Sequence, residues 1–263
     1  MAKLIRRKPS FFNHLKNDGV AGLVIMGSSG EFCNLDMIKS KKLIDIAASF
    51  DKGSLRVFSG ASRMDPEESV ALANYAFEKG LDEVMILSSY YFPLNQDAIF
   101  DFYSFIASKT PSKIFIYNFP AHTGHSVSPE TTLKLVDKHN NIYGFKDSIL
   151  DMGNNSDLIK IVKEIFPHFE VYSGFDNNFT HNILSEGNDC IGGLSNIIPD
   201  YFRLWMDSLA IWDMAQVSEC QRHIDKRMDI YTISDNFIPV IKKPWYFVKL
   251  SAPIYACRLI ITN

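Results

Sequence analysis

Three polar segments stand where short apolar segments end, and together they could do covalent chemistry. Lys146 follows Ile142-Tyr143-Gly144-Phe145, Tyr117 follows Ile114-Phe115-Ile116, and the turn Gly27-Ser28-Ser29-Gly30 follows another apolar run. A lysine kept uncharged by burial attacks carbonyl carbons, a tyrosine carries protons, and the hydroxyl and backbone N–H groups of a turn bind carboxylate or phosphate. Singly, each has an ordinary explanation as a surface lysine, a core-edge aromatic residue or a glycine turn. Three such strand ends in one chain favour a shared site.

Several other kinds of site are not expected. The glycine turn lacks the Gly-Lys-Ser/Thr of a P-loop and the G-x-G-x-x-G of a dinucleotide site. His122 and His125 lie three apart without a third ligand nearby, so they do not predict a metal site. Asp147 follows Lys146 directly and would project to the other face of a strand. It is therefore not expected to be the partner of that lysine.

The alternation of segments predicts the secondary structure. Most of the predicted strands are continuously apolar, which is typical of parallel strands covered on both faces. Between them, Asp65-Pro66-Glu67-Glu68 and Ser128-Pro129-Glu130 predict helix starts, and Val70, Ala73 and Phe77 predict a buried helix face. The seven predicted strands are 22–26, 55–59, 83–87, 113–118, 142–146, 170–174 and 189–193.

Strands alternating with helices predict either a (β/α)8 TIM barrel or an open doubly wound sheet. A barrel is favoured because it would direct the polar residues at the strand ends into one central site, whereas an open sheet would spread them along an edge. No strand is predicted before a helix at about 10–18, so the barrel is predicted to lack its first strand. Residues 1–200 are predicted to form the catalytic barrel and 201–263 a C-terminal helical extension. The strand-end residues are Ser28, Ser59, Ser88, Tyr117, Lys146, Ser173 and Gly193.

Composition narrows the class of protein. The chain has 263 residues, of which 46% are hydrophobic, and a net charge of −3. These values are typical of a globular enzyme. The chain has no long basic run that would attract nucleic acid. No apolar run could span a bilayer, no signal peptide is recognisable, and the cysteines Cys33, Cys190, Cys220 and Cys257 show no C-x-x-C spacing. We expect a cytoplasmic protein with reduced thiols and no nucleic-acid or membrane partner.

In this order, the segments resemble those of the dihydrodipicolinate synthase and N-acetylneuraminate lyase superfamily of pyruvate-dependent class I aldolases. Gly27-Ser28-Ser29-Gly30-Glu31 is similar to the family's Gly-Thr-Thr-Gly-Glu turn, and Gly144-Phe145-Lys146-Asp147-Ser148 to its Schiff-base lysine segment. The segment 117–124 is similar to its tyrosine segment, and Ser88-Ser89-Tyr90-Tyr91 to its paired-tyrosine loop. The resemblance runs from about Phe11 to Lys242.

The resemblance implies a TIM barrel, assembly into a dimer or tetramer, and a covalent imine in place of any metal or organic cofactor. It assigns Lys146 as the imine-forming amine and Tyr117 as the proton carrier. Ser28 would complete the proton relay together with Tyr91, which would reach into the site of a neighbouring subunit. Substrate binding is assigned to Gly27, Ser29, Gly174, Asp176, Ile191 and Gly192.

Local similarity suggests a substrate class. The chain resembles 2-keto-3-deoxygluconate aldolase-like proteins in its Gly-Glu-Phe and Tyr-Asn-Phe-Pro-Ala runs and in Pro167-His168-Phe169, which precedes Gly174-Phe175-Asp176. This predicts cleavage of a 2-keto-3-deoxy sugar acid to pyruvate and a small hydroxyaldehyde. Dihydrodipicolinate synthase and N-acetylneuraminate lyase are alternatives. His122 stands where the synthases usually carry an arginine fork, and Asn177 where the lyases carry glutamate.

Two departures from the family suggest other hypotheses. The family's first strand and much of its final helical region have no recognised counterpart, and Leu259-Ile260-Ile261-Thr262 is apolar. A barrel that lacks a strand would have an open edge. A second hypothesis is therefore an inactive or truncated family member that binds 2-keto acids or acts as a subunit partner. A third is a barrel with unrelated chemistry, in which Lys146→Ala would leave activity intact.

Overall fold

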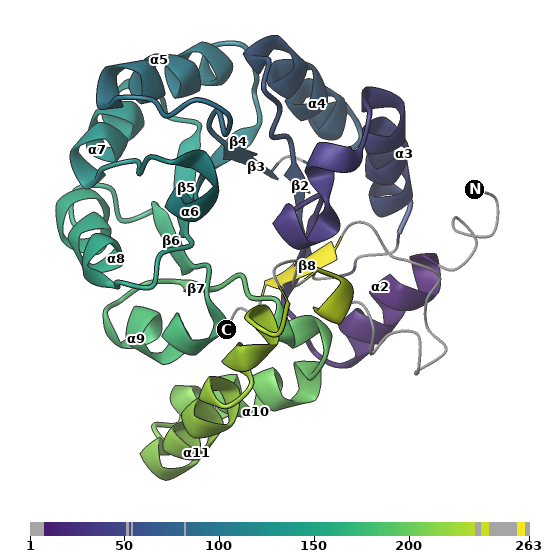
Figure 1. Ribbon diagram of the computed structural model, residues 1–263, viewed down its shortest axis with the longest axis vertical. Coiled ribbons are helices and arrows are strands. Elements are labelled where there is room, and N and C mark those ends of the chain that lie inside the picture. The colour runs from purple at the N-terminus through teal and green to yellow at the C-terminus, as the bar shows by residue number, and fades with distance from the viewer. Residues whose placement is uncertain are drawn as a thin grey trace.

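The structure is a computed structural model that describes residues 8–50, 53, 55–81, 83–234, 238–241 and 257–260. Seven parallel strands follow one another in chain order around a curled sheet (Figure 1). Each predicted strand is present, with bounds that differ from the expected ones by at most three residues, and the barrel is confirmed. The strands are β1 (Gly22–Ile25), β2 (Arg56–Gly60), β3 (Glu83–Leu87), β4 (Lys113–Asn118), β5 (Ile142–Asp147), β6 (Glu170–Ser173) and β7 (Asp189–Cys190).

Helices surround the strands on the outside of the ring (Figure 1). Asp65 and Ser128 cap helices as expected, because their side chains accept hydrogen bonds from Glu67 N and Thr131 N. The predicted buried face of α4 is wrong at Phe77, which is 43% exposed, and Ala76 is buried instead. The outer helices are α3 (Met37–Ala48), α4 (Pro66–Glu78), α5 (Gln96–Ala107), α7 (Pro129–Lys138), α8 (Gly153–Leu158) with its π-helical continuation η3 (Ile159–Lys163), and α9 (Phe179–Leu184).

The remaining helices lie at the ends of the chain or inside loops. The helix predicted at about 10–18 is α2 (Lys8–Asn17), and α10 (Pro199–Ala210) and α11 (Met214–Asp225) project from the ring beside α9 (Figure 1). The short ones are η1 (Ser28–Gly30), η2 (Phe32–Asn34), α6 (Pro120–Thr123), η4 (Asp176–Asn178), η5 (Leu194–Asn196) and η6 (Met228–Tyr231). Within the described residues, no helix has both the length and the apolar character needed to cross a membrane.

An eighth strand corrects two expectations. β8 (Cys257–Ile260) pairs antiparallel with β1, with Leu23 opposite Leu259, so the predicted open edge at β1 is wrong. The expectation of a helical end is also wrong at these four residues, whereas the rest of 245–263 lies outside the described part of the chain. The backbone N–H and C=O groups of an unpaired edge need partners, and a short apolar segment supplies them here. The pairing joins residues more than 200 positions apart, so local patterns could not reveal it.

Aromatic rings fill the interior of the barrel toward the N-terminal ends of its strands. Phe58, Phe115 and Tyr172 contact one another at ring-centroid distances of 4.6 to 6.3 Å. Gly144 on β5 is required by this packing, because a Cβ there would overlap the ring of Phe115 and the carbonyl of Glu170. The side chains therefore fill the barrel as a core, and polar chemistry is confined to its two ends.

Candidate functional site

Lys146, Tyr117 and Ser28 meet at the C-terminal ends of the strands. β4 and β5 pair in parallel with Tyr117 directly beside Lys146, which places both side chains on the same face of the sheet. Lys146 is fully buried, and its Nζ lies 4.0 Å from the centroid of the Tyr117 ring. The Tyr117 hydroxyl and the Ser28 Oγ are 3.0 Å apart, at hydrogen-bonding distance. The three residues that the sequence singled out therefore form one cluster.

Burial of Lys146 is the chemically decisive feature of this cluster. Water is excluded from the side chain, and a medium of low polarity disfavours the ammonium form relative to the neutral amine. The neutral amine is the form that adds to a carbonyl carbon. The interpretation of Lys146 as an ordinary surface lysine is wrong, since none of its side chain is exposed.

Asp147 lies on the opposite face of β5 and has other partners. Its carboxylate accepts hydrogen bonds from Asn118 Nδ2 at 2.8 Å and from Asn154 Nδ2 at 2.7 Å. Burial raises the pKa of Asp147 to about 6, and the two amide donors oppose that shift. The expectation that Asp147 projects away from Lys146 is confirmed. The amides instead tie the end of β5 to β4 and α8.

The raised pKa of Asp147 predicts a pH-dependent contribution to stability. The unfolded carboxyl loses its proton near pH 4 and the folded one near pH 6, so the folded state binds more protons between these values. The free energy of unfolding therefore falls as pH rises through this window, by roughly 2–3 kcal/mol for this group. Urea unfolding of the wild type and of Asp147→Asn at pH 4, 5, 6 and 7 would show their difference changing by this amount. Parallel pH profiles would contradict the prediction.

The glycine turn presents hydroxyl groups toward the same end of the barrel. Gly27 precedes η1 in an extended conformation, and Glu31 follows it with φ 55°, in the left-handed region. Ser29 is buried, and its Oγ has no hydrogen-bond partner among the described residues. The same is true of the Ser148 hydroxyl, just after β5. Ser59 and Ser173 do not face the cluster as expected, because Phe58 and Tyr172, which precede them, point into the barrel and successive side chains of a strand alternate between its faces. Buried polar groups are normally paired, so the Ser29 and Ser148 hydroxyls fit a site that receives a polar ligand.

The carboxylate of Asp176, which was predicted to bind substrate, forms hydrogen bonds within the protein. It is fully buried and accepts hydrogen bonds from the backbone N–H groups of Gly193 and Leu194, both at 3.1 Å. The Tyr231 hydroxyl donates a third bond at 2.5 Å. These contacts hold the loop after β7 in place, and a Cβ at Gly192 would collide with this carboxylate. A contact between Asp176 and substrate stays a prediction.

The other predicted substrate-binding positions line the same loops. Gly174 packs so closely on Ser148 that a Cβ would overlap its hydroxyl. Ile191 is fully buried, and its backbone N–H donates to the carbonyl of Ser173. Both follow strands whose ends converge on the mouth of the barrel. The geometry gives them positions near the cluster, and their roles stay predictions.

Tyr91 lies outside the cluster within this chain. It is 75% exposed, and its ring contacts Phe92 with centroids 4.7 Å apart.

His125 anchors this loop, a role that was not predicted from the sequence, where it was considered only as a metal ligand. His125 Nε2 lies 2.8 Å from Ser88 Oγ, and its Nδ1 accepts from the Leu94 N–H at 3.1 Å. Burial lowers the pKa of His125, which favours this neutral acceptor form. No local pattern distinguishes such a histidine.

Metal chemistry has no evident site in the part of the chain that the structure describes. No group of three or more His, Cys, Asp or Glu side chains gathers there in a way that could hold an ion. His122 packs edge-on against Phe119 with ring centroids 4.2 Å apart, and His125 bonds to Ser88 and Leu94.

Comparison with known proteins identifies the family. The chain matches the profile of the dihydrodipicolinate synthetase family over residues 8–258. It is 29% identical over 245 residues to YjhH of Escherichia coli K12, provisionally named a 2-dehydro-3-deoxy-D-pentonate aldolase, covering 92% of this chain and 80% of YjhH. It is 28% identical over 234 residues to the 4-hydroxy-tetrahydrodipicolinate synthase of Kosmotoga olearia, covering 88% and 79% of the two chains.

Solved structures share the fold. The structure of YagE from E. coli K12 in complex with pyruvate superimposes with a TM-score of 0.89 at 24% identity, covering 95% of this chain and 87% of YagE. The dihydrodipicolinate synthase of Aquifex aeolicus gives 0.88 at 22% identity, covering 95% and 84%. The family consists of pyruvate-dependent lyases and aldolases. A family match over nearly the whole chain and a fold shared with these enzymes lead to one conclusion: this protein belongs to the dihydrodipicolinate synthetase family.

Proposed function

We propose that this protein is a class I aldolase that cleaves a 2-keto-3-deoxy sugar acid to pyruvate and a small hydroxyaldehyde. The observation that carries the proposal is the fully buried Lys146 against the ring of Tyr117, whose hydroxyl reaches Ser28. An amine, a proton carrier and a hydroxyl-rich turn are the groups that imine-based cleavage of a 2-keto acid requires.

The residues supply each step. The neutral Lys146 amine adds to the C2 carbonyl of the substrate and expels water, which leaves a positively charged iminium. Tyr117 acts as the base that takes the proton of the C4 hydroxyl while the C3–C4 bond breaks. The bonding electrons move into the iminium, which becomes a neutral enamine, and the aldehyde departs. Tyr117 then returns the proton to C3, and water hydrolyses the iminium to release pyruvate and the Lys146 amine.

The surrounding loops would position the substrate. Ser28 would keep the Tyr117 hydroxyl oriented. The Gly27 turn and the buried Ser29 hydroxyl would bind the pyruvyl carboxylate. Backbone groups at Gly174, Ile191 and Gly192 and the carboxylate of Asp176 are proposed to contact the hydroxylated part of the substrate. The exposed Tyr91 would act in the site of a neighbouring subunit of a dimer or tetramer.

The relatives support the substrate class. YjhH and YagE carry provisional names as aldolases for 2-dehydro-3-deoxy-D-pentonate and 2-dehydro-3-deoxy-D-gluconate. A synthase is the second candidate, since similarly close relatives are named 4-hydroxy-tetrahydrodipicolinate synthase. His122, which packs on Phe119, cannot form the two-pronged contact of an arginine with a carboxylate, and this favours the aldolase.

Reductive trapping tests the proposal. The protein is incubated with pyruvate and sodium borohydride, and its intact mass is measured. We expect a stoichiometric adduct that maps to Lys146 and is absent from Lys146→Ala. Lys113 is a matched control, because its Nζ also lies over a tyrosine ring, 4.5 Å from the centroid of Tyr143, at the other end of β4. Lys113→Ala should keep the adduct. A folded wild-type protein without an adduct would refute the aldolase.

Substrate identity needs a separate comparison. Turnover of 2-keto-3-deoxygluconate and 2-keto-3-deoxypentonate should exceed the condensation of pyruvate with aspartate semialdehyde and the cleavage of N-acetylneuraminate. The reverse order would favour a synthase or a neuraminate lyase. An adduct without turnover of any of these compounds would favour a 2-keto acid binder.

A further inference from the structure

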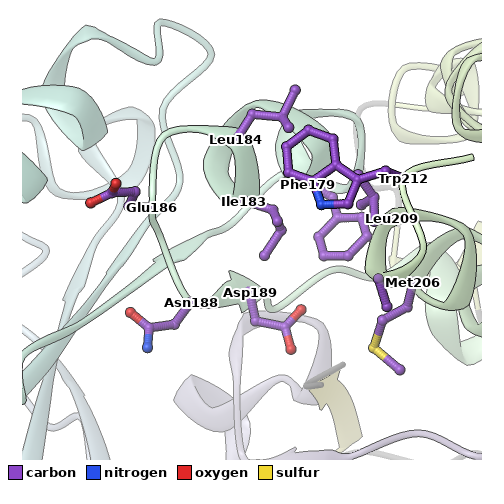
Figure 2. Close-up of a pocket in the computed structure, with 10 residues that line it drawn as sticks. Phe179, Ile183, Leu184, Glu186, Asn188, Asp189, Met206, Leu209 and Trp212 are labelled. Carbon is purple, nitrogen blue, oxygen red and sulfur yellow. The ribbon is translucent and has the colours of Figure 1, made fainter. Parts of the chain in front are cut away.

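The pocket between α9 and α10 is largely apolar, and polar groups at its edge are bonded within the protein. Its volume is about 420 Å³, and Figure 2 shows the rings of Phe179 and Trp212 beside it. At the edge, Lys163 Nζ donates to the carbonyl of Glu186 and to the side chain of Asn188. These groups do not select one class of ligand, whereas a histidine at the mouth of the barrel has a more specific arrangement.

One imidazole ring connects the loops that follow β3 and β4. His125, in the loop after β4, contacts both ends of residues 88–94, which we call the tyrosine loop because they include Tyr91. His125 Nε2 lies 2.8 Å from Ser88 Oγ at the start of the tyrosine loop, and the Leu94 N–H at its end donates to Nδ1 at 3.1 Å. A single side chain therefore fixes both ends of the loop.

The tip of the tyrosine loop has little other support. Tyr90 holds the middle of the loop through an edge-on contact with Phe32, with ring centroids 5.7 Å apart. Tyr91 and Phe92, by contrast, are 75% and 66% exposed and contact each other. Exposed side chains with few packed neighbours do little to hold a segment in place. The orientation of Tyr91 therefore depends strongly on the bonds at the two ends of the loop.

The turn that carries His125 lies directly against the tyrosine loop. Thr123 Oγ1 donates to the His125 carbonyl at 2.7 Å, and Gly124 has a φ of 72°, in the left-handed region. A Cβ at Gly124 would approach Pro93 Cγ to 3.2 Å. The backbone is therefore held close to the loop, and the imidazole is fixed between its two partners.

The two hydrogen bonds define the protonation state of His125. Nδ1 accepts from a backbone N–H group and so carries no proton, which leaves Nε2 as the donor to Ser88. A proton on Nδ1 would set it against the Leu94 N–H and break that bond. Burial lowers the pKa of His125 below its usual value of 6.5, so the neutral ring prevails at neutral pH.

Other ionisable groups do not set the charge of His125. Burial is the main cause of its lowered pKa, and a hydrogen bond with Thr123 opposes it. Asp147 titrates near pH 6, and Asn118 links it to Ser126 beside His125, so proteins that are compared must all keep it. The other ionisable side chains at the adjoining ends of the neighbouring elements are Tyr90, Tyr91, Asp97, Tyr117, His122 and Glu130, with Tyr103 near Ser88.

We propose that neutral His125 is a positioning residue for the aldol reaction, which holds the tyrosine loop through Ser88 and Leu94 in the conformation in which Tyr91 acts. A proton on Nδ1 releases the loop. The inference rests on the proposed function, because Tyr91 has a part in catalysis only there. Since only the neutral ring accepts the Leu94 N–H, kcat should fall as pH decreases below 6.5.

Two variants of His125 separate its bonds from its charge. His125→Phe keeps a ring but loses both bonds, and it should lower kcat at pH 7.5 by about tenfold or more, because a displaced loop misplaces Tyr91. His125→Asn keeps an acceptor oxygen near the place of Nδ1 and does not titrate, so it should recover most of that loss. The ratio of wild-type kcat to that of His125→Asn should fall by about threefold or more between pH 7 and pH 5. Asp147 is common to both proteins and cancels in this ratio.

Hydrogen exchange at the Leu94 amide measures the loop without turnover. The protection factor, which corrects for the intrinsic exchange rate at each pH, should fall by about tenfold in His125→Phe. It should also fall from pH 7 to pH 5 in the wild type but not in His125→Asn. His139 provides a matched control at the opposite end of the barrel, because it is partly buried, has a lowered pKa and bonds to Ser104 Oγ through Nε2 at 2.9 Å. His139→Asn should match the wild type in both measurements.

The outcomes distinguish this inference from the proposed function. Equal Leu94 protection in the wild type and His125→Phe would overturn the inference, as would unchanged kcat in His125→Phe. If that variant does not fold, a constant ratio of wild-type to His125→Asn kcat between pH 7 and pH 5 would also overturn it. A wild type that turns over no 2-keto-3-deoxy sugar acid would refute the proposed function and, with it, a catalytic part for the loop.

Discussion

Replacing Tyr117 with phenylalanine is expected to lower kcat for aldol cleavage by roughly 10²–10⁴-fold, which is the usual contribution of a positioned proton carrier. The ring would remain against Lys146, because the substitution removes only the hydroxyl that lies 3.0 Å from Ser28 Oγ. Imine formation with pyruvate should therefore survive, and borohydride should still trap the adduct at Lys146. Steady-state kinetics and intact-mass measurements on the same preparation separate these two steps.

A matched tyrosine provides the control for Tyr117→Phe. Tyr143 lies on the neighbouring strand β5, at the opposite end of the barrel, under the Lys113 ammonium group. Tyr143→Phe removes an equivalent hydroxyl and should leave kcat within about twofold of wild type, since no step of the proposed reaction uses it. If Tyr117→Phe kept full turnover, Tyr117 would not be the proton carrier. If it lost the adduct as well, its role would lie in imine formation.

Replacing Arg56 with methionine is expected to lower the free energy of unfolding by about 3 kcal/mol. The Arg56 guanidinium lies at the N-terminal end of the barrel strands. Its Nη2 bonds to the carboxylate of Glu83 at 2.6 Å and its Nη1 to the carboxylate of Glu170 at 2.9 Å. Nη1 also donates to the Tyr172 hydroxyl at 2.9 Å, so one side chain connects β2, β3 and β6. Its removal would leave two partly buried carboxylates close together without their cation. Urea unfolding followed by circular dichroism measures the loss.

Two further variants define the cause of that loss. Combining Arg56→Met with Glu83→Gln and Glu170→Gln removes the uncompensated charges and should restore at least half of the lost stability. Arg203→Met removes a solvent-exposed pair with Asp207 and should cost no more than about 1 kcal/mol, because water already solvates both groups. A loss as small as that of Arg203→Met would show that the Arg56 cluster contributes little.

Local patterns in the sequence were sufficient to predict most of the helices and strands. The apolar runs that predicted the seven parallel strands are buried on both faces, so burial requires nearly every residue in them to be apolar. Asp65 and Ser128 cap their helices because the cap bonds reach only two or three residues along the chain. Phe77 was wrongly predicted to be buried. Apolar periodicity identifies one face of a helix but does not show how far along that face the core extends.

Most of the strand ends, and with them the meeting of Lys146 and Tyr117, could be predicted from the sequence. Parallel strands in register bring their last residues together whatever the loops do. Two other features could not be predicted in this way. The pairing of β8 with β1 and the use of the Asp176 carboxylate by the loop after β7 both depend on residues distant in the chain. The sequence states which side chains are polar, but it does not state their hydrogen-bond partners. Only three-dimensional packing establishes which partner each polar side chain contacts.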